Sequence, residues 1–302
     1  MTAADVRPAQ VSTAADVTAV DPSARQSSLW NRLRRNRAAM WGLCGVALAI
    51  AIALAARALA PYDPTDQVLS DRLQGPSRAH WFGTDDLGRD VLSRTLVAVR
   101  TSLVAAATAL AVALGVGLPV GLMAGMIRGV GAAVVQRCVE AVMSLPALLI
   151  ALALGAAFGQ DLTSGMIAVG FVFSVALIQV IRASTRLVMA EPFVEASLAA
   201  GLSAGTVVFR HVVPHVIRPL IVQFALLAAG AIEIEASLSF LGLGARAGEQ
   251  VSLGGMIRSA TPFLQSDVRL LVVPGAVVCA LVLSWSLLAD GLRDVLATGV
   301  DR

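Results

Sequence analysis

The sequence contains no lysine. All 23 basic residues in the chain of 302 are arginines. A P-loop needs a lysine that reaches the nucleotide phosphates, and Schiff-base catalysis needs a lysine amine, so both kinds of chemistry are excluded. If the chain works with ATP, we therefore expect a partner ATPase to bind the ATP and Mg²⁺, and we expect no cofactor in this chain.

Charged residues are also scarce. They make up 14% of the chain, whereas hydrophobic residues reach 57%; soluble proteins have roughly 25% and 45–50%. Several apolar runs approach ~20 residues, the length that a helix needs to cross the ~30 Å hydrocarbon core of a bilayer. The composition therefore predicts an all-α integral membrane protein rather than a soluble α/β core.

Cysteine and histidine are too few and too scattered to indicate a metal site. Cys44, Cys138 and Cys279 lie in or beside apolar runs and are expected to be small buried hydrophobic residues. His211 and His215 are four residues apart, but a proline intervenes and no acidic third ligand is near. We therefore expect neither a metal site nor a catalytic centre.

Composition divides the chain into four regions. Residues 1–28 lack both periodicity and a signal-peptide pattern, which predicts a disordered cytoplasmic tail. Residues 29–100 are predicted to form an anchor helix and an outer loop, 101–295 a core of five more membrane helices, and 296–302 a short cytoplasmic tail. The six expected spans are 41–60, 103–127, 139–158, 165–181, 219–241 and 270–289.

Two features inside these runs concern helix packing. The second run carries glycines at a spacing that lets helices approach closely in a bilayer: Gly115, Gly117, Gly121 and Gly125. In the third run Pro146 is expected to kink the helix.

An arginine cluster predicts the orientation. The segment 32–37 contains four arginines directly before the first apolar run, and basic residues that flank a span stay on the cytoplasmic side. With six spans, both termini are expected in the cytoplasm and the loop 61–100 outside.

The outer loop contains three aspartates close together: Asp85, Asp86 and Asp90. They could suggest a metal cluster. The pattern favours a helix start instead, with Thr84 or Asp85 as the N-cap and with Arg89 or Arg94 as local partners.

A polar segment, 191–214, separates the fourth and fifth runs. Pro192 suits a first helical turn, and Gly201 stands where a left-handed cap would end that helix. Ser203 is expected to cap a second short helix, 204–213, which Pro214 would end. Because this second helix is rich in valine, neighbouring spans or a partner protein must cover it. We name the two expected helices the knob.

Three motifs resemble those of a known family. Residues 195–201, followed by Val213-Pro214, resemble the EAA coupling loop of bacterial ABC importer permeases. Residues 235–244, Glu-Ala-Ser-Leu-Ser-Phe-Leu-Gly-Leu-Gly, and the loop motif at 82–94 resemble the C-type subunit of dipeptide, oligopeptide and nickel importers. Departures from the family pattern are Ser197 for Ala, Val213 for Leu, and Ser252-Leu253-Gly254 for Ser-Trp-Gly.

The resemblance, which covers about 30–294, implies the type I importer permease fold with six transmembrane helices and a cytoplasmic coupling loop. It implies that the knob docks in a cleft of the ATPase through Glu195, Ala196, Ser197, Gly201, Phe209 and Pro214. Expected partners are two cytoplasmic ABC ATPase domains, a second homologous permease, an extracytoplasmic solute-binding protein and the lipid of the bacterial inner membrane, with no nucleic acid. Short peptides are the first expectation for the substrate, and nickel or another small solute is the alternative.

Two acidic residues stand inside the fifth run. Carboxylates within a membrane span are costly and are functional candidates by default. Glu233 and Glu235 point to different faces of a helix, so they do not form an evident acid pair, and each is a candidate for lining the pore or for packing. An ion-coupled secondary transporter that uses one of them is the rival hypothesis, although it leaves the knob unexplained.

Overall fold

The computed structural model describes residues 29–127, 129–146, 148–150, 152–153, 161–243 and 251–297, and in these ranges the regular elements are helices. The five long helices are α2 (Arg37–Leu59), α3 (Val91–Met126), α6 (Leu162–Met189), α9 (Val213–Phe240) and α11 (Arg269–Ala297). The short ones are α1 (Leu29–Arg35), α4 (Val130–Met143), α7 (Pro192–Ala199), α8 (Ala204–Val207), α10 (Leu253–Ala260), the 3₁₀ turns η2 (Leu69–Asp71) and η4 (Thr261–Phe263), and the π-helical turn η3 (Val208–Val212).

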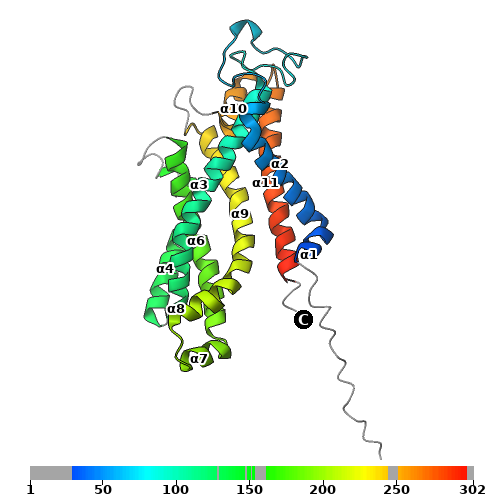
Figure 1. The fold of residues 1–302 in the computed structure, drawn as a ribbon. Helices are drawn as coiled ribbons and strands as arrows, with labels where there is room; N and C mark the ends of the chain where they lie inside the picture. The colour runs from blue at the N-terminus through cyan, green and yellow to red at the C-terminus, as the bar shows by residue number, and fades with distance from the viewer. Residues whose placement is uncertain are drawn as a thin grey trace, which may run out of the picture.

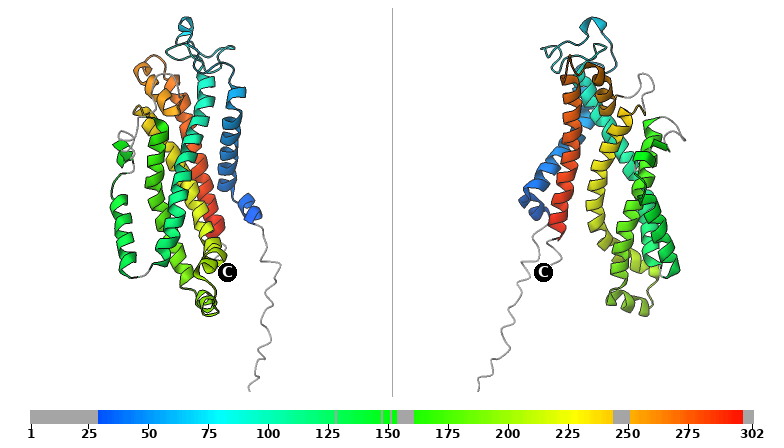
Figure 2. Two further views of the ribbon diagram at one scale, coloured as in Figure 1. Left: turned by 60° about the vertical axis from the view of Figure 1, so that its left-hand side comes forward. Right: turned by 180° about the vertical axis from the view of Figure 1, so that it is seen from behind.

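The long helices form one bundle with two different ends (Figures 1 and 2). At one end, α7 lies beyond the other helices, with α8 next to it; we call this the α7 end. At the opposite end, which we call the α10 end, lie α10 and the loop that joins α2 to α3. The bundle thus presents a different structure on each side of a membrane.

Five helices in the described ranges are long and apolar enough to cross a membrane, and each overlaps one of the six expected spans, although some are longer than expected. The expected third span, 139–158, lies partly outside the described residues. In the part that is described, α4 ends at Met143, and the chain leaves the helical conformation before Pro146 instead of kinking there.

Close packing between α3 and α6 supports a sixth crossing. A Cβ atom added to Gly117 would lie 2.8 Å from Leu177 Cβ, and one added to Gly121 would lie 2.8 Å from Ile181 Cβ. Since both residue numbers rise together along this contact, the two helices run parallel. Because α3 and α6 run in the same direction, the chain that joins the end of α3 to the start of α6 has to return from one end of the bundle to the other. We call the contact the glycine seam.

The same use of small residues fixes α2 against α11, which run antiparallel. A Cβ on Gly42 would lie 2.3 Å from the backbone nitrogen of Leu288, and one on Gly291 would lie 2.3 Å from Ala39 Cβ. Helix α9 packs against α3, α6 and α11, and therefore joins the two pairs of helices. Such backbone-to-backbone approach is typical of helices that associate in lipid, where apolar side chains gain little by leaving the bilayer.

Helix α3 begins well before the expected start of the second span at 103. Its N-cap is Asp90, whose Oδ2 accepts a hydrogen bond from the backbone N–H of Ser93 at 2.7 Å, so the expected caps Thr84 and Asp85 were wrong. The expected local ion pairs are confirmed, because Asp85 Oδ2 lies 2.7 Å from Arg89 Nε and 3.4 Å from Arg94 Nε. Because Asp85 offsets its charge, the Arg94 side chain can be buried.

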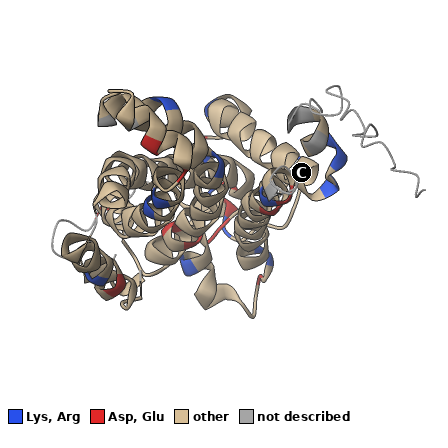
Figure 3. Ribbon diagram, turned by 90° about the horizontal axis from the view of Figure 1, so that it is seen from below, with Lys and Arg blue, Asp and Glu red and all other residues tan. Residues whose placement is uncertain are grey.

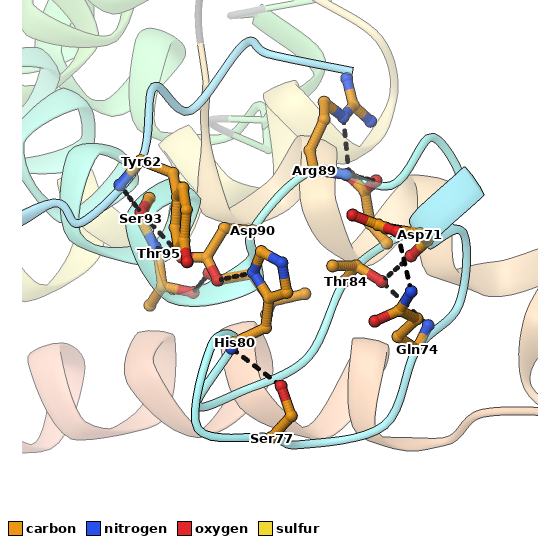
Figure 4. Close-up of polar contacts among 12 residues, drawn as sticks. Tyr62, Asp71, Gln74, Ser77, His80, Thr84, Arg89, Asp90, Ser93 and Thr95 are labelled. Carbon is orange, nitrogen blue, oxygen red and sulfur yellow. Dashed lines mark hydrogen bonds and ion pairs between the residues drawn. The ribbon is translucent and has the colours of Figure 1, made fainter. Parts of the chain in front are cut away.

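The loop before α3 is a compact cap held by polar contacts (Figure 4). His80 Nδ1 lies 3.0 Å from the second oxygen of Asp90, and the backbone N–H of Tyr62 donates to Ser93 Oγ at 3.1 Å. The backbone N–H of Gln74 donates to Thr84 Oγ1 at 2.9 Å. Hydrogen bonds thus hold the loop, which includes the start of the 82–94 motif, against the first turn of α3.

This packing leads to a first prediction. Gly125→Ala should lower the thermal midpoint of the detergent-solubilised chain, because its new Cβ would lie 2.4 Å from Thr185 Cβ; such overpacking costs about 1–3 kcal/mol. Gly115→Ala is the matched control, since nothing lies within 4 Å of its Cβ, and it should be neutral or stabilising by up to ~1 kcal/mol. Equal midpoints for the two variants would contradict the glycine seam.

Candidate functional site

The first helix of the knob has one buried side chain, and most of its other described side chains are exposed. Helix α6 ends at Met189, and α7 begins at Pro192, whose fixed φ suits a first turn. Val194 is buried, with 1% of its surface exposed, and belongs to the main hydrophobic cluster. Glu195 and Ala196 are exposed, so the residues expected to contact a partner lie on the outer face of α7.

Gly201 makes the bend between the two helices of the knob, as expected. Its φ is +87°, in the left-handed region, and the backbone N–H of Leu202 donates to the carbonyl oxygen of Ser197 at 3.2 Å. This is the hydrogen bond of a Schellman cap. Nothing lies within 4 Å of a Cβ placed on Gly201, so backbone conformation and not crowding disfavours other residues there.

The second helix starts as expected but does not end as expected. Ser203 Oγ accepts a hydrogen bond from the backbone N–H of Thr206 at 3.2 Å and so caps α8. Pro214 does not end the helix, because the helical chain continues from 205 through η3 into α9 as far as 240. The backbone N–H of Val213 donates to the carbonyl of Val208, a π-type bond. The wider π turn accommodates the proline ring, which lacks an N–H and would clash with an α-helical carbonyl.

The apolar residues of the second helix divide into two sets. Val207, Val208 and Val212 are buried within the chain, so neighbouring helices cover them. Phe209 is 77% exposed, and the Phe193 ring packs edge-on against the His211 ring at a centroid distance of 5.4 Å. An outer surface remains that is both apolar and acidic, formed by Phe193, Glu195, Ala196, Leu202 and Phe209.

Glu235 is fully buried at the contact between α9 and α3. Ser102 Oγ donates to its Oε2 at 2.6 Å, and Ser239 Oγ donates to its Oε1 at 2.9 Å. Both carboxyl oxygens therefore have a partner, which a buried polar group requires. Ser102 lies far away in the sequence, and nothing in the sequence indicated it as the partner of Glu235.

The rest of the 235–244 motif that the structure describes also serves packing. Gly242, with φ of +100°, ends α9, and the N–H of Leu243 donates to the carbonyl of Leu238 at 3.0 Å. A Cβ on Gly254 would lie 2.0 Å from the carbonyl oxygen of Ala236, so α10 packs directly on α9. Leu253 is completely buried.

Glu233 lies on another face of α9 and is exposed. No side chain in the described part of the molecule pairs with its carboxylate, and Ser237 Oγ donates to its backbone carbonyl at 2.9 Å. The two carboxylates thus separate into one buried and satisfied group and one available for contacts outside this chain.

A cavity of about 840 Å³ at the α10 end was not anticipated from the sequence. Arg57 of α2, Arg100 and Thr101 of α3, and Asp63 of the connecting loop contribute to its lining. The side-chain and backbone hydrogen bonds from Thr65 lower the pKa of the Asp63 carboxyl. These residues come from separate regions of the sequence, so no motif connects them.

The structure also tests the expectations for cysteine and histidine. Cys44, Cys138 and Cys279 are exposed on the isolated chain, so the expectation of buried residues was wrong; each lies on a helix surface that faces away from its neighbours. His215 Nδ1 donates to the carbonyl oxygen of His211 at 2.7 Å. Among the described residues, no group of three or more potential metal ligands comes together.

Comparisons with known proteins agree with this architecture. Residues 117–302 match the family model described as binding-protein-dependent transport system inner membrane component, and residues 27–76 match the N-terminal transmembrane domain of oligopeptide transport permease C. The chain belongs to this transport permease family.

Two relatives illustrate the relationship. The dipeptide transport system permease protein DppC of Escherichia coli (strain K12) is 40% identical over 286 residues, which is 93% of this chain and 95% of the relative. The glutathione transport system permease protein GsiD of Shigella flexneri serotype 5b (strain 8401) is 37% identical over 268 residues, which is 88% of each chain. The protein is a membrane-embedded permease subunit of an ABC importer and not an enzyme, and its family works with an ATPase and a binding protein.

The different environments of the two carboxylates give a second prediction. Glu235→Ala should lower the thermal midpoint of the permease, because two buried hydroxyl donors lose their acceptor at a cost of about 1–3 kcal/mol, with a further cost for the cavity. Glu233→Ala, the matched control on the same helix, should stay within ~0.5 kcal/mol of the parent. Thermal unfolding in detergent measures both, and an equal loss for the two variants would contradict a specific packing position for Glu235.

Proposed function

We propose that the permease forms half of a translocation path for short peptides, together with a second homologous permease subunit. The names of its relatives, a dipeptide and a glutathione transport permease, support a peptide substrate over nickel. In this proposal two cytoplasmic ABC ATPase domains bind ATP and Mg²⁺, and an external binding protein delivers the substrate.

We propose further that the permease couples to the ATPase through the knob, with Glu195, Ala196, Ser197, Gly201, Phe209 and Pro214 at or beside the contact. The observation that carries this proposal is the outer surface of the knob, on which the Phe209 side chain is 77% exposed. A solvated loop gains nothing from such an apolar surface, which is typical of a protein interface. Since the second helix continues into α9, a displacement of the knob would act directly on a membrane helix.

We also propose that the α7 end and both termini are cytoplasmic. Figure 3 views the bundle from that end and shows arginine-bearing segments on several helices. The cluster at 32–37 lies in α1 and at the first residue of α2, directly before a span, where basic residues hold the span end on the cytoplasmic side.

For Glu233 we propose a position on the translocation path or against the second permease. The side chain is exposed within a long apolar helix. A carboxylate that faced lipid would be costly, so this face of α9 needs water or a protein partner.

The orientation gives a third prediction. In a variant whose three native cysteines are replaced by alanine, Ser77→Cys in the outer loop should react with a membrane-impermeant maleimide in intact cells. Ala199→Cys on the knob should react only after the membrane is opened. Both positions are exposed in the structure, so accessibility within the chain does not limit either reaction. Labelling of both positions from the same side would contradict the proposed topology.

The knob gives a fourth prediction. Gly201→Val should sharply reduce both transport and the ATPase stimulation by loaded binding protein in reconstituted vesicles, because a residue with a Cβ at this φ costs roughly 1–2 kcal/mol. Gly201→Asn is the matched control, since asparagine adopts the left-handed conformation more readily, and it should retain more of both activities. Glu195→Arg should act like the valine variant by reversing the charge at the contact.

Assembly of the complex is the control for these variants, because the membrane helices lie elsewhere and should still insert and pair. Near-normal transport and stimulated ATPase activity in both Gly201→Val and Glu195→Arg would mean that the knob is only a connector. A loss of assembled complex would instead show that the knob is needed for folding.

A further inference from the structure

A second cavity, of about 490 Å³, lies between helices toward the α7 end. Arg218 and His215 of α9 and Arg293 of α11 line it, together with apolar residues such as Val180 of α6, Val222 and Leu296. Its volume falls within the ~300–1,000 Å³ that is usual for small-molecule sites. The function described above uses none of these side chains.

The charge in this cavity is of one sign. No acidic residue lines it, and neither Arg218 nor Arg293 makes an ion pair within the described residues. Asp294, next to Arg293 in the sequence, accepts a hydrogen bond from Asn36, the N-cap of α2, at 3.2 Å. Two guanidinium groups without carboxylate partners therefore border one space, and such a pair favours an anion with several acceptor oxygens.

The position of the cavity in the bundle favours one kind of anion. Arg218 lies near the first turns of α9, and Arg293 lies in the last turns of α11, so both are near the ends of membrane spans. Val180, Val222 and Leu296 continue the lining with apolar surface on the same spans. A free phosphate ion would leave this apolar wall unused, whereas a phospholipid places phosphate and hydrocarbon side by side at this depth.

We propose that this cavity binds the phosphate headgroup of an anionic phospholipid, with Arg218 and Arg293 as its ligands and the apolar lining against the start of the acyl chains. Since α9 continues into the knob, such a lipid would connect the knob-bearing helix to α11. The proposal requires only that these helices span a membrane, so it does not depend on the substrate, the orientation or the ATPase contact.

The test measures binding of short-chain lipids to the full-length permease in detergent, through the shift of the thermal midpoint with ligand concentration. Dioctanoyl phosphatidylglycerol should raise the midpoint in a saturable way. Dioctanoyl phosphatidylcholine, which has no net charge, and inorganic phosphate, which has no acyl chain, should give much smaller shifts. In Arg218→Gln/Arg293→Gln the apparent affinity for phosphatidylglycerol should fall by about tenfold or more for each arginine removed.

The matched control is Arg137→Gln/Arg186→Gln, which removes two exposed arginines outside the cavity and should leave the affinity unchanged. If the first double variant does not fold, Val222→Trp should fill the apolar part of the cavity and weaken the phosphatidylglycerol shift while the arginines remain. Equal shifts with phosphatidylcholine, an equal loss in the control, or no loss in both cavity variants would overturn the proposal. A full shift with inorganic phosphate alone would also overturn it, in favour of a free-anion site.

Discussion

The close contact of α3 with α6 is the constraint on which the other parts depend. Because glycines bring the two helices together in parallel, the chain between them must cross the bundle, and α6 must deliver the knob to the end opposite the outer loop. Helix α3 also carries Ser102, which donates to Glu235 of α9. One helix therefore positions both α6 and α9, the two helices that lead into and out of the knob.

The second helix of the knob is connected to α9 by an unbroken helical backbone. In a bilayer each backbone N–H and C=O needs a hydrogen-bond partner. The chain must therefore be helical again soon after Pro214, where it enters the membrane span. The π turn η3 meets this requirement by leading without a break into α9, which contains Pro214, and the Val213 N–H donates to the carbonyl of Val208. The second helix of the knob is consequently the first part of one continuous helix with α9, fastened at its base by Val207, Val208 and Val212, and not a separate module on a flexible loop.

The sequence predicted the membrane class, five of the spans and the cap at Gly201, because each depends on local properties: run length, composition and backbone conformation. The sequence did not predict features that depend on contacts between residues far apart in the chain. Ser102 has no sequence link to Glu235, and the start of α3 depends on a folded loop that satisfies Asp90 from both sides. The proline rule failed at Pro214 because a wider helical turn can accommodate the ring without ending the helix.

The motif at 235–244, which resembles the dipeptide, oligopeptide and nickel importer branch, serves mainly helix packing in its described part, 235–243. Ser239 donates a hydrogen bond to the buried carboxylate of Glu235, and Gly242 ends α9. Gly254 of α10 packs against the backbone of Ala236. These residues specify how the helices pack, so proteins that carry different solutes can share them. In the proposed function, discrimination among solutes depends instead on groups that this packing leaves exposed. Glu233 is such a group, because the same helix that buries Glu235 turns its other carboxylate outward.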